Sequence, residues 1–357
     1  MSLLRRLARG LLLSALALAM FGLLGEIIAR SFGLVDRLNG FPRRLFVATD
    51  DPDLGYRLRP DIDTQARGVH VVTNEHGMRG ASVARTPAPG THRVLVLGDS
   101  VAFGFRLEEP DTFPVLLEQE IEARDDGAWE VLNAGVEGYN TRNQLVYLRT
   151  SLLDFAPETI VLVFNLNDYD YGPIMGPLGV LTTDQSQRVR SDSLAIRSEF
   201  FLLLRWLLAL LQGGAWVGNT PAAPAAPAPG DESQFLPFDR YVSALRKQYY
   251  RKPSDERWQV MIDSLRQIAE TCRARGIRLL LAIVPDGDQI GVAAPDLTPQ
   301  QKLHDICTEL ALDCLDLQPS FAAAQSAHLY LDIMHPNADG QRIMARAVAA
   351  HLLDRAD

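Results

Sequence analysis

Residues 93–100 read RVLVLGDS, a short apolar run that ends in a glycine, an acid and a serine. The run is too short for a helix and is rich in branched side chains, as is typical of a strand buried on both faces of a parallel sheet. Residues 111–124 (DTFPVLLEQEIEAR) follow, with apolar side chains at helical spacing and Asp111 or Thr112 as the cap of the predicted helix. This strand and helix predict the first unit of an α/β fold.

The same alternation recurs to the end of the chain. Strands are expected at residues 131–136, 159–164, 277–284 and 314–317, and helices at 140–155, 254–275, from 298 onward and at 338–353. The end signals include a cap at Asn140, a stop at Gly276 and a capping box with proline at 298–301 (TPQQ). We therefore expect a three-layer α/β/α sandwich around a mostly parallel sheet.

An insertion at about residues 171–253 interrupts the alternation. Within it, residues 200–211 (FFLLLRWLLALL) are too few for a membrane span and include Arg205. We expect an amphipathic helix that rests on the sheet or on a bilayer surface. Residues 221–230 (PAAPAAPAPG) predict an extended linker. The insertion as a whole is either a lid over a site or a surface excursion.

The amino terminus carries a long apolar run. Residues 11–28 (LLLSALALAMFGLLGEII) would extend roughly 27 Å as a helix, near the thickness of a bilayer core. Arg5, Arg6 and Arg9 precede it, which favours a cytoplasmic amino terminus, although arginines also follow the run. An uncleaved signal anchor is favoured over a cleaved signal, because the Ala-x-Ala sites lie inside the run. The expected organisation is an anchor at 1–35, an extended connector at 36–92 and one domain at 93–357.

Composition limits the classes of function. The 357 residues are 47% hydrophobic and 22% charged, with a net charge of −9, which excludes wholesale disorder and argues against nucleic acid as a partner. The three cysteines, Cys272, Cys307 and Cys314, show no CxxC pairing, so we expect neither a zinc cluster nor a disulfide framework. Cys307 and Cys314 can still form one bridge in an oxidising compartment.

Chemically useful side chains follow the predicted strands. In sheets of this kind, ligands bind at the carboxyl ends of the strands. The first strand delivers Ser100 to that edge, the second a glycine turn at 135–138 (GVEG), and the third two asparagines at 165–168 (NLND). Asp332 and His335 stand just before the last helix. The sequence thus predicts one edge that combines a serine, a glycine turn, an asparagine and an Asp/His pair.

These side chains make up a nucleophilic site. A serine hydroxyl is a poor nucleophile until an imidazole takes its proton, and a carboxylate can orient that imidazole. Ser100, His335 and Asp332 are the candidates for these roles. The backbone N–H groups of Ser100 and Gly138 and the side-chain amide of Asn167 are candidate oxyanion donors. Each motif alone is also an ordinary turn or helix cap, so the specific signal is their joint occurrence in this order.

The four blocks resemble those of the SGNH (GDSL-type) hydrolases: GDS at 98–100, the glycine at 138, Asn-Asp at 167–168 and DxxH at 332–335. The resemblance covers roughly residues 93–353. It implies a flavodoxin-like sandwich, serine esterase or lipase chemistry through an acyl-enzyme, and no cofactor. By the same analogy Ser100 is the nucleophile, His335 the base and Asp332 its orienting acid, with Gly138 and Asn167 as oxyanion donors.

The chain departs from the family pattern in small ways. Val101 stands where the family name has leucine. Gly135 competes with Gly138 for the oxyanion role, and we prefer Gly138. Asn165 competes with Asn167, and we prefer Asn167 because an acid follows it. The anchor and the insertion resemble those of membrane-attached bacterial members.

The expected function is a serine ester hydrolase on the outer face of a bacterial inner membrane, held by a single span. Its substrates would be O-acetyl or other acyl esters of cell-envelope polysaccharide or lipid. An O-acyltransferase that uses the same acyl-serine is an alternative, and so is a non-catalytic scaffold that kept the fold. Dinucleotide binding is disfavoured because the first strand lacks GxGxxG, and metal catalysis because no second histidine or carboxylate cluster accompanies His335.

Overall fold

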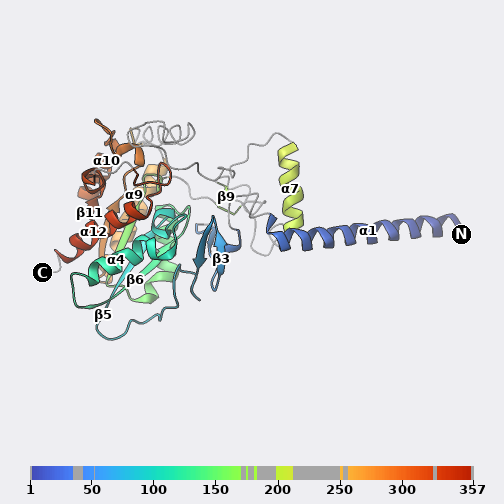
Figure 1. Ribbon diagram of the computed structural model, residues 1–357, viewed down its shortest axis with the longest axis horizontal. Coiled ribbons are helices and arrows are strands. Elements are labelled where there is room, and N and C mark those ends of the chain that lie inside the picture. The colour runs from blue at the N-terminus through green and yellow to red at the C-terminus, as the bar shows by residue number, and fades with distance from the viewer. Residues whose placement is uncertain are drawn as a thin grey trace.

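Five parallel strands form the central sheet of the computed structural model (Figure 1). They are β5 (Thr91–Gly98), β6 (Ala128–Gly135), β7 (Thr159–Phe164), β10 (Arg278–Ile283) and β11 (Asp313–Asp316). Their order across the sheet is β11-β10-β7-β5-β6, so the chain winds first to one side of β5 and then to the other. This is the doubly wound, flavodoxin-like order, in which ligands bind where the winding reverses. The expected fold class is confirmed.

The structure describes residues 2–34, 43–51, 53–169, 174–175, 181–182, 198–211, 250–251, 256–324 and 328–354. The linker predicted at 221–230 and most of the insertion lie outside these residues. The described parts of the insertion include two short paired strands, β8 (Ile174–Met175) and β9 (Leu181–Thr182), and the helix α7 (Glu199–Leu211).

Helices cover both faces of the sheet because alternate strand residues face opposite cores. Leu95 and Leu97 of β5 face one core, whereas Val94 and Val96 face the other. The first core is closed by α5 (Thr141–Tyr147), α9 (Glu256–Ala274) and α10 (Thr298–Leu310). The second is closed by α3 (Ser100–Phe103), α4 (Phe113–Glu122), α11 (Gln318–Ala323) and α12 (Ala338–Leu353).

Two helices differ in detail from the expectation. The predicted helix at 140–155 is an α-helix only as far as Tyr147, and continues as a π-helical turn, η3 (Leu148–Leu152), and a 3₁₀ turn, η4 (Leu153–Phe155). The capping box expected at 298–301 is absent. Instead, Asp296 Oδ1 accepts a hydrogen bond from the Thr298 N–H at 3.1 Å, so the acid upstream caps this helix. Two further 3₁₀ turns, η2 (Glu109–Asp111) and η7 (Gly287–Gln289), lie in loops.

The segment before the sheet packs onto its first core. It contains a 3₁₀ turn, η1 (Arg43–Leu45), and two antiparallel pairs, β1 (Phe46–Ala48) with β2 (Tyr56–Leu58) and β3 (Asp63–Ala66) with β4 (Val69–Val72). Leu45, Phe46 and Tyr56 are fully buried there. The connector is thus attached to the domain along much of its length.

The amino-terminal helix α1 (Ser2–Phe32) extends away from the sheet (Figure 1). Among the described residues, Ala8–Phe32 is the one segment long and apolar enough to span a bilayer, and its large apolar side chains are exposed. Helix α7 stands across α1 near the carboxyl end of α1 (Figure 1).

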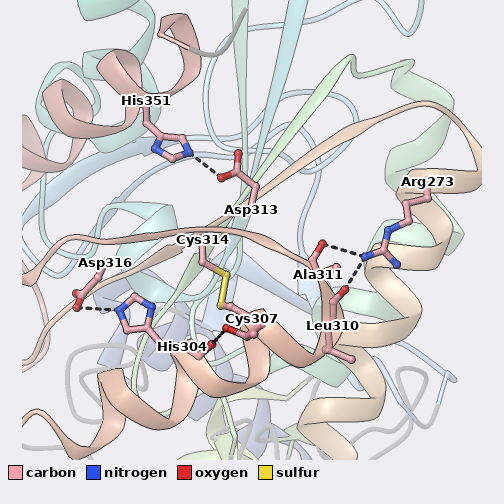
Figure 2. Close-up of a disulfide and its surroundings, with 10 residues drawn as sticks. Arg273, His304, Cys307, Leu310, Ala311, Asp313, Cys314, Asp316 and His351 are labelled. Atoms are coloured by element: carbon pink, nitrogen blue, oxygen red, sulfur yellow. Dashed lines mark hydrogen bonds and ion pairs between the residues drawn. A yellow bond between two sulfur atoms is a disulfide. The ribbon is translucent and has the colours of Figure 1, made fainter.

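A disulfide joins Cys307 of α10 to Cys314 of β11, with the two Cα atoms 6.3 Å apart (Figure 2). This is the bridge that the sequence left open. It fastens the edge strand of the sheet to the helix that precedes it. Arg273 adds a second tie by donating to the carbonyl oxygens of Leu310 and Ala311 at the end of α10. The remaining cysteine, Cys272, is free and buried.

Candidate active site

Ser100 lies at the carboxyl end of β5, as the first residue of α3. The turn between strand and helix is tight, and Asp99 caps the helix by accepting a hydrogen bond from the Val101 N–H at 2.8 Å. Ser100 is only 7% exposed. Because β5 adjoins the point where the winding of the sheet reverses, this turn places a hydroxyl where α/β folds bind their ligands.

The imidazole of His335 contacts that hydroxyl. Its Nε2 lies 2.8 Å from the Ser100 Oγ, and its Nδ1 lies 2.8 Å from each carboxylate oxygen of Asp332. A nitrogen held between two carboxylate oxygens carries the proton, which leaves Nε2 as the acceptor for the serine hydroxyl. The structure therefore brings together all three residues that the sequence singled out for nucleophilic chemistry.

The loop that carries this pair is firmly held. The Leu331 N–H donates to the His335 carbonyl at 2.8 Å, and the Tyr330 hydroxyl donates to the Pro285 carbonyl at 2.6 Å. Asp332 Oδ1 accepts the N–H groups of Met334 and His335, each at 3.0 Å. Burial by itself would raise the pKa of Asp332, but the adjacent His335 and these hydrogen bonds lower that pKa to about 2. The carboxylate is therefore ionised at neutral pH.

The candidate oxyanion donors lie at the ends of three adjacent strands. Ser100 follows β5, Gly138 follows β6 and Asn167 follows β7. Gly138 has a φ of +80°, a conformation that favours glycine. In the part of the chain that the structure describes, the Gly138 N–H has no hydrogen-bond acceptor. It therefore stays a candidate donor to a ligand.

The two competing residues have other contacts. The Gly135 N–H donates to Asn133 Oδ1 at 3.0 Å, and a Cβ at Gly135 would lie 2.2 Å from the Phe103 nitrogen. Gly135 is therefore required for the close approach of α3 to the sheet. Asn165 is buried, and its amide donates to Asp99 Oδ2 at 3.3 Å. These contacts favour Gly138 and Asn167 as the residues open to a ligand.

The model of the GDSL-like lipase/acylhydrolase family matches residues 96–343. The chain belongs to this family. The match includes the strand ends and the Asp332–His335 loop just described, and the protein is an SGNH-type ester hydrolase.

Several solved structures resemble the hydrolase at low sequence identity. A putative lipolytic protein of the G-D-S-L family from Desulfitobacterium hafniense is 12% identical, with 72% of this chain and 97% of that chain covered and a TM-score of 0.38. TesA is 14% identical, with 73% and 99% covered and a TM-score of 0.39. Axe2, an acetylxylan esterase from Geobacillus stearothermophilus, is 13% identical, with 72% and 92% covered and a TM-score of 0.41. No curated protein matches the hydrolase in sequence.

Phe105 is a site residue that the sequence did not reveal. Its ring stacks on the His335 imidazole, with centroids 4.0 Å apart and planes 21° apart. The guanidinium of Arg67 lies 4.7 Å from the centroid of the Phe105 ring. Phe105 belongs to the loop after α3, and no periodicity or motif in the sequence connects it with a histidine 230 positions away. Only the folded chain brings the rings together.

Two buried acids lie at the strand ends: Asp99 directly precedes the serine, and Asp168 directly follows Asn167. Burial raises the pKa of Asp99, whose Oδ2 lies 3.4 Å from the Ser100 Oγ. Burial raises the pKa of Asp168 well above its usual range, and the charge of Asp99 raises it further. Gln144 donates to Asp168 Oδ2 at 3.1 Å. Because the Ser100 hydroxyl is closer to His335 Nε2 than to Asp99, the imidazole is its preferred acceptor.

The connector supports the site from outside the sheet. Buried Arg79 donates to the carbonyl oxygens of Phe103, Gly104 and Leu107, and so fixes both ends of the loop that carries Phe105. The Tyr56 hydroxyl donates to the Glu137 carbonyl at 2.6 Å, directly before Gly138. These supports were not predicted, because residues 36–92 gave no sign of reaching the strand ends.

No metal site accompanies this arrangement among the described residues. No group of three or more His, Cys, Asp or Glu side chains is placed there to hold a metal ion. The site instead combines a hydroxyl, an imidazole with a carboxylate on its other side, and the N–H of Gly138, which are the kinds of group that acyl transfer uses.

Proposed function

We propose that the hydrolase cleaves acyl esters through an acyl-enzyme on Ser100, with His335 as general base and Asp332 as its orienting acid. The single observation that carries this proposal is the 2.8 Å contact between Ser100 Oγ and His335 Nε2, with Asp332 on the other side of the ring. This distance is in the range over which a base can take a proton from a nucleophile.

In the first half of the reaction, the Ser100 Oγ forms a bond to the ester carbonyl carbon while its proton passes to His335 Nε2. The carbonyl oxygen becomes an oxyanion, which the N–H groups of Ser100 and Gly138 and the Asn167 amide would stabilise. The bond from carbon to the alcohol oxygen then breaks. His335 Nε2 returns the proton to the departing alcohol, and the acyl group stays on Ser100.

The second half repeats these steps with water. His335 Nε2 takes a proton from the attacking water, whose oxygen bonds to the acyl carbon. The bond from that carbon to Ser100 Oγ breaks, the proton returns to Oγ, and the carboxylic acid leaves. Asp332 stays ionised throughout and stabilises the imidazolium that forms in each half, because its pKa is about 2.

A fluorophosphonate probe tests the nucleophile, since it reacts with serines activated in this way. We expect labelling of the full chain, loss of labelling in Ser100→Ala and His335→Gln, and unchanged labelling in Ser82→Ala. Ser82 is an exposed serine whose hydroxyl donates to Glu75, away from the site, so it is a matched control. Labelling that survives Ser100→Ala in folded protein contradicts the proposal. Circular dichroism verifies that the variants fold.

We propose that the substrates are O-acetyl or other acyl esters of cell-envelope polysaccharide or lipid, reached on the outer face of a bacterial inner membrane. The apolar α1, preceded by Arg5, Arg6 and Arg9, supports a membrane anchor with a cytoplasmic amino terminus. The Cys307–Cys314 disulfide supports an oxidising compartment for the domain, because such bridges are rare in the cytosol of most organisms.

Location and substrate are tested separately. Full-length chain retained in membranes after alkaline carbonate washing, with a carboxyl-terminal tag open to protease in spheroplasts, supports the proposed anchor and orientation. A shorter soluble chain would indicate a cleaved signal instead. Acid released from acetylated polysaccharide, compared with release from acylated lipid, identifies the substrate. Transfer of the acyl group to a sugar hydroxyl, without acid release, would identify an O-acyltransferase.

A further inference from the structure

We propose that helix α7 lies along the outer boundary of the membrane, with one apolar face turned into the lipid and its amino terminus fixed to α1. The hydrolase would then contact the bilayer through two elements, a spanning helix and a helix in the plane of the interface. This inference rests on the membrane anchoring by α1 proposed above. Its partner is the lipid bilayer itself.

The first observation is a charged residue inside the apolar helix. Glu26 lies within the candidate span Ala8–Phe32, where an acid is costly unless it is paired. Its carboxylate accepts hydrogen bonds from the Ser198 hydroxyl at 2.9 Å, the Glu199 N–H at 3.1 Å and the Phe200 N–H at 2.9 Å. Arg30, one turn further on, donates to it at 2.6 Å. Glu26 therefore caps the amino terminus of α7 from another helix.

The second observation is the depth at which α7 meets α1. The Phe200 ring packs edge-on against Phe21, with centroids 5.4 Å apart, and lies over Gly25, which has no side chain to obstruct it. Phe21 and Gly25 both precede Glu26, so they lie deeper in the span. At 1.5 Å per residue, Phe21 lies about 7.5 Å deeper than Glu26, which is within the depth to which an interfacial helix buries its apolar face.

The third observation is the direction of the apolar face. Phe200, Leu204 and Leu207 fall within about 60° of one another around a helix that advances 100° per residue. Phe200 contacts the part of α1 that lies deeper in the membrane. Leu204 and Leu207 share its face of α7, so they point to the same depth. Leu204 and Leu207 are 41% and 48% exposed. With a bilayer around α1, this face is covered by hydrocarbon, which removes exposed leucine from water.

The crossing of the two helices agrees with this placement. Figure 1 shows α7 standing across α1, not alongside it, at the end of α1 nearer the sheet. A helix that crosses a membrane span at the boundary of the apolar region lies in the plane of that boundary. The sequence offered both the sheet and a bilayer surface as supports for this helix, and the contacts with α1 favour the bilayer.

The test uses the full chain reconstituted in phosphatidylcholine vesicles, with an environment-sensitive NBD probe on a single introduced cysteine in a Cys272→Ala background. Leu207→Cys reports on α7, Leu16→Cys on α1, and Asp126→Cys on an exposed position in the domain. We expect blue-shifted emission, quenched at least twofold by doxyl-labelled lipid, for the first two probes. We expect water-like, unquenched emission for the third.

The outcomes separate this inference from the proposed function. A quenched Leu16 probe with a water-like Leu207 probe overturns the placement of α7 and leaves the anchor standing. A blue-shifted Leu207 probe without lipid quenching shows that protein covers the face, and also overturns the placement. Water-like, unquenched emission from both the Leu16 and the Leu207 probes overturns the proposed membrane anchor. Ester hydrolysis measured on the same vesicles reports separately on the catalytic proposal.

A second variant tests the fixation by Glu26. Glu26→Ala removes the acceptor for Ser198, Glu199 and Phe200, so we expect lipid quenching of the Leu207 probe to fall while that of the Leu16 probe is unchanged. Quenching of the Leu207 probe that is unaffected by Glu26→Ala would overturn the proposed fixation of α7 to α1.

Discussion

Asp332 holds its charge because His335 and two backbone N–H groups surround it. A pKa lowered from 3.8 to about 2 means that folding favours the ionised form. The associated stability is present above about pH 4 and is lost as the pH falls through about 2. Since one pKa unit corresponds to about 1.4 kcal/mol and the side chain keeps some solvent contact, its contribution is at most about 2 kcal/mol.

Asp332→Asn removes this contribution and the orienting charge together. We expect kcat for an acetyl ester to fall by about 10²- to 10⁴-fold at neutral pH, because the imidazolium loses its partner. The variant should unfold more easily than the parent at pH 6, and the difference should disappear near pH 2. Urea unfolding at both pH values measures this. A stability difference that persists at pH 2 would contradict the linkage to Asp332.

Phe105, on the loop after α3, stacks on the imidazole of His335 and so fixes the plane of that ring. Aromatic stacking is worth about 0.5–1.5 kcal/mol, so Phe105→Leu should lower kcat roughly 2- to 10-fold with little change in KM. Phe105→Tyr keeps the ring and is the matched control. A rise in KM alone would show that Phe105 contacts the substrate instead of positioning His335.

At the scale of single elements, α3 depends on the glycine that faces it. A methyl group on Gly135 would lie 2.2 Å from the Phe103 nitrogen and 2.6 Å from the Ala102 carbonyl carbon, so Gly135→Ala must displace the helix that begins with Ser100. We expect a loss of about 1–3 kcal/mol in unfolding free energy, and a fall in kcat of about 10²-fold or more.

Gly291→Ala is the control for Gly135→Ala. Gly291 has a φ of +73° and open space around the position of a Cβ. The only cost of alanine there is the left-handed backbone conformation that it must adopt, which destabilises the fold by about 1–2 kcal/mol. It should lower the unfolding free energy without lowering kcat. Full activity in Gly135→Ala would show that α3 tolerates the displacement.

The elements of the sheet were predictable because each carries its own local signal. The strand at 159–164 is an unbroken apolar run, and its observed bounds are those expected. The helix after Asn140 was predicted only in part, since nothing in the sequence marks the π-helical turn at Leu148. The tie between Arg79 and the loop of Phe105 was not predicted at all. It joins segments about 25 residues apart, and a buried arginine has no local signature.

The candidate site was predictable for a similar reason. Ser100, Gly138 and Asn167 directly follow apolar strands, so a parallel sheet brings them to one edge whatever the rest of the chain does. Phe105 reaches the same edge on a loop, and Tyr56 reaches it on the short strand β2. The paths of both segments depend on tertiary packing. Their contacts with His335 and Glu137 required the fold.

On the scale of the whole molecule, the Cys307–Cys314 bridge ties the last strand of the sheet to its preceding helix. Closing a loop of this length restricts the unfolded chain and is worth about 2–3 kcal/mol. Cys307→Ser combined with Cys314→Ser should lower the unfolding free energy by that amount. The melting temperature of the parent should fall on adding dithiothreitol, and that of the double variant should not change. A double variant as stable as the parent would contradict the prediction.

Ser100 and His335 lie 235 residues apart in the sequence, although their side chains touch. A ribosome adding about 5–20 residues per second makes the serine roughly 10–50 s before the histidine. Throughout that interval the nascent chain carries Ser100 without the imidazole that we propose as its base. On the proposed mechanism, a chain that ends before Asp332 is inert. The same mechanism makes the hydrolase reactive only when its carboxyl-terminal stretch has been made and folded.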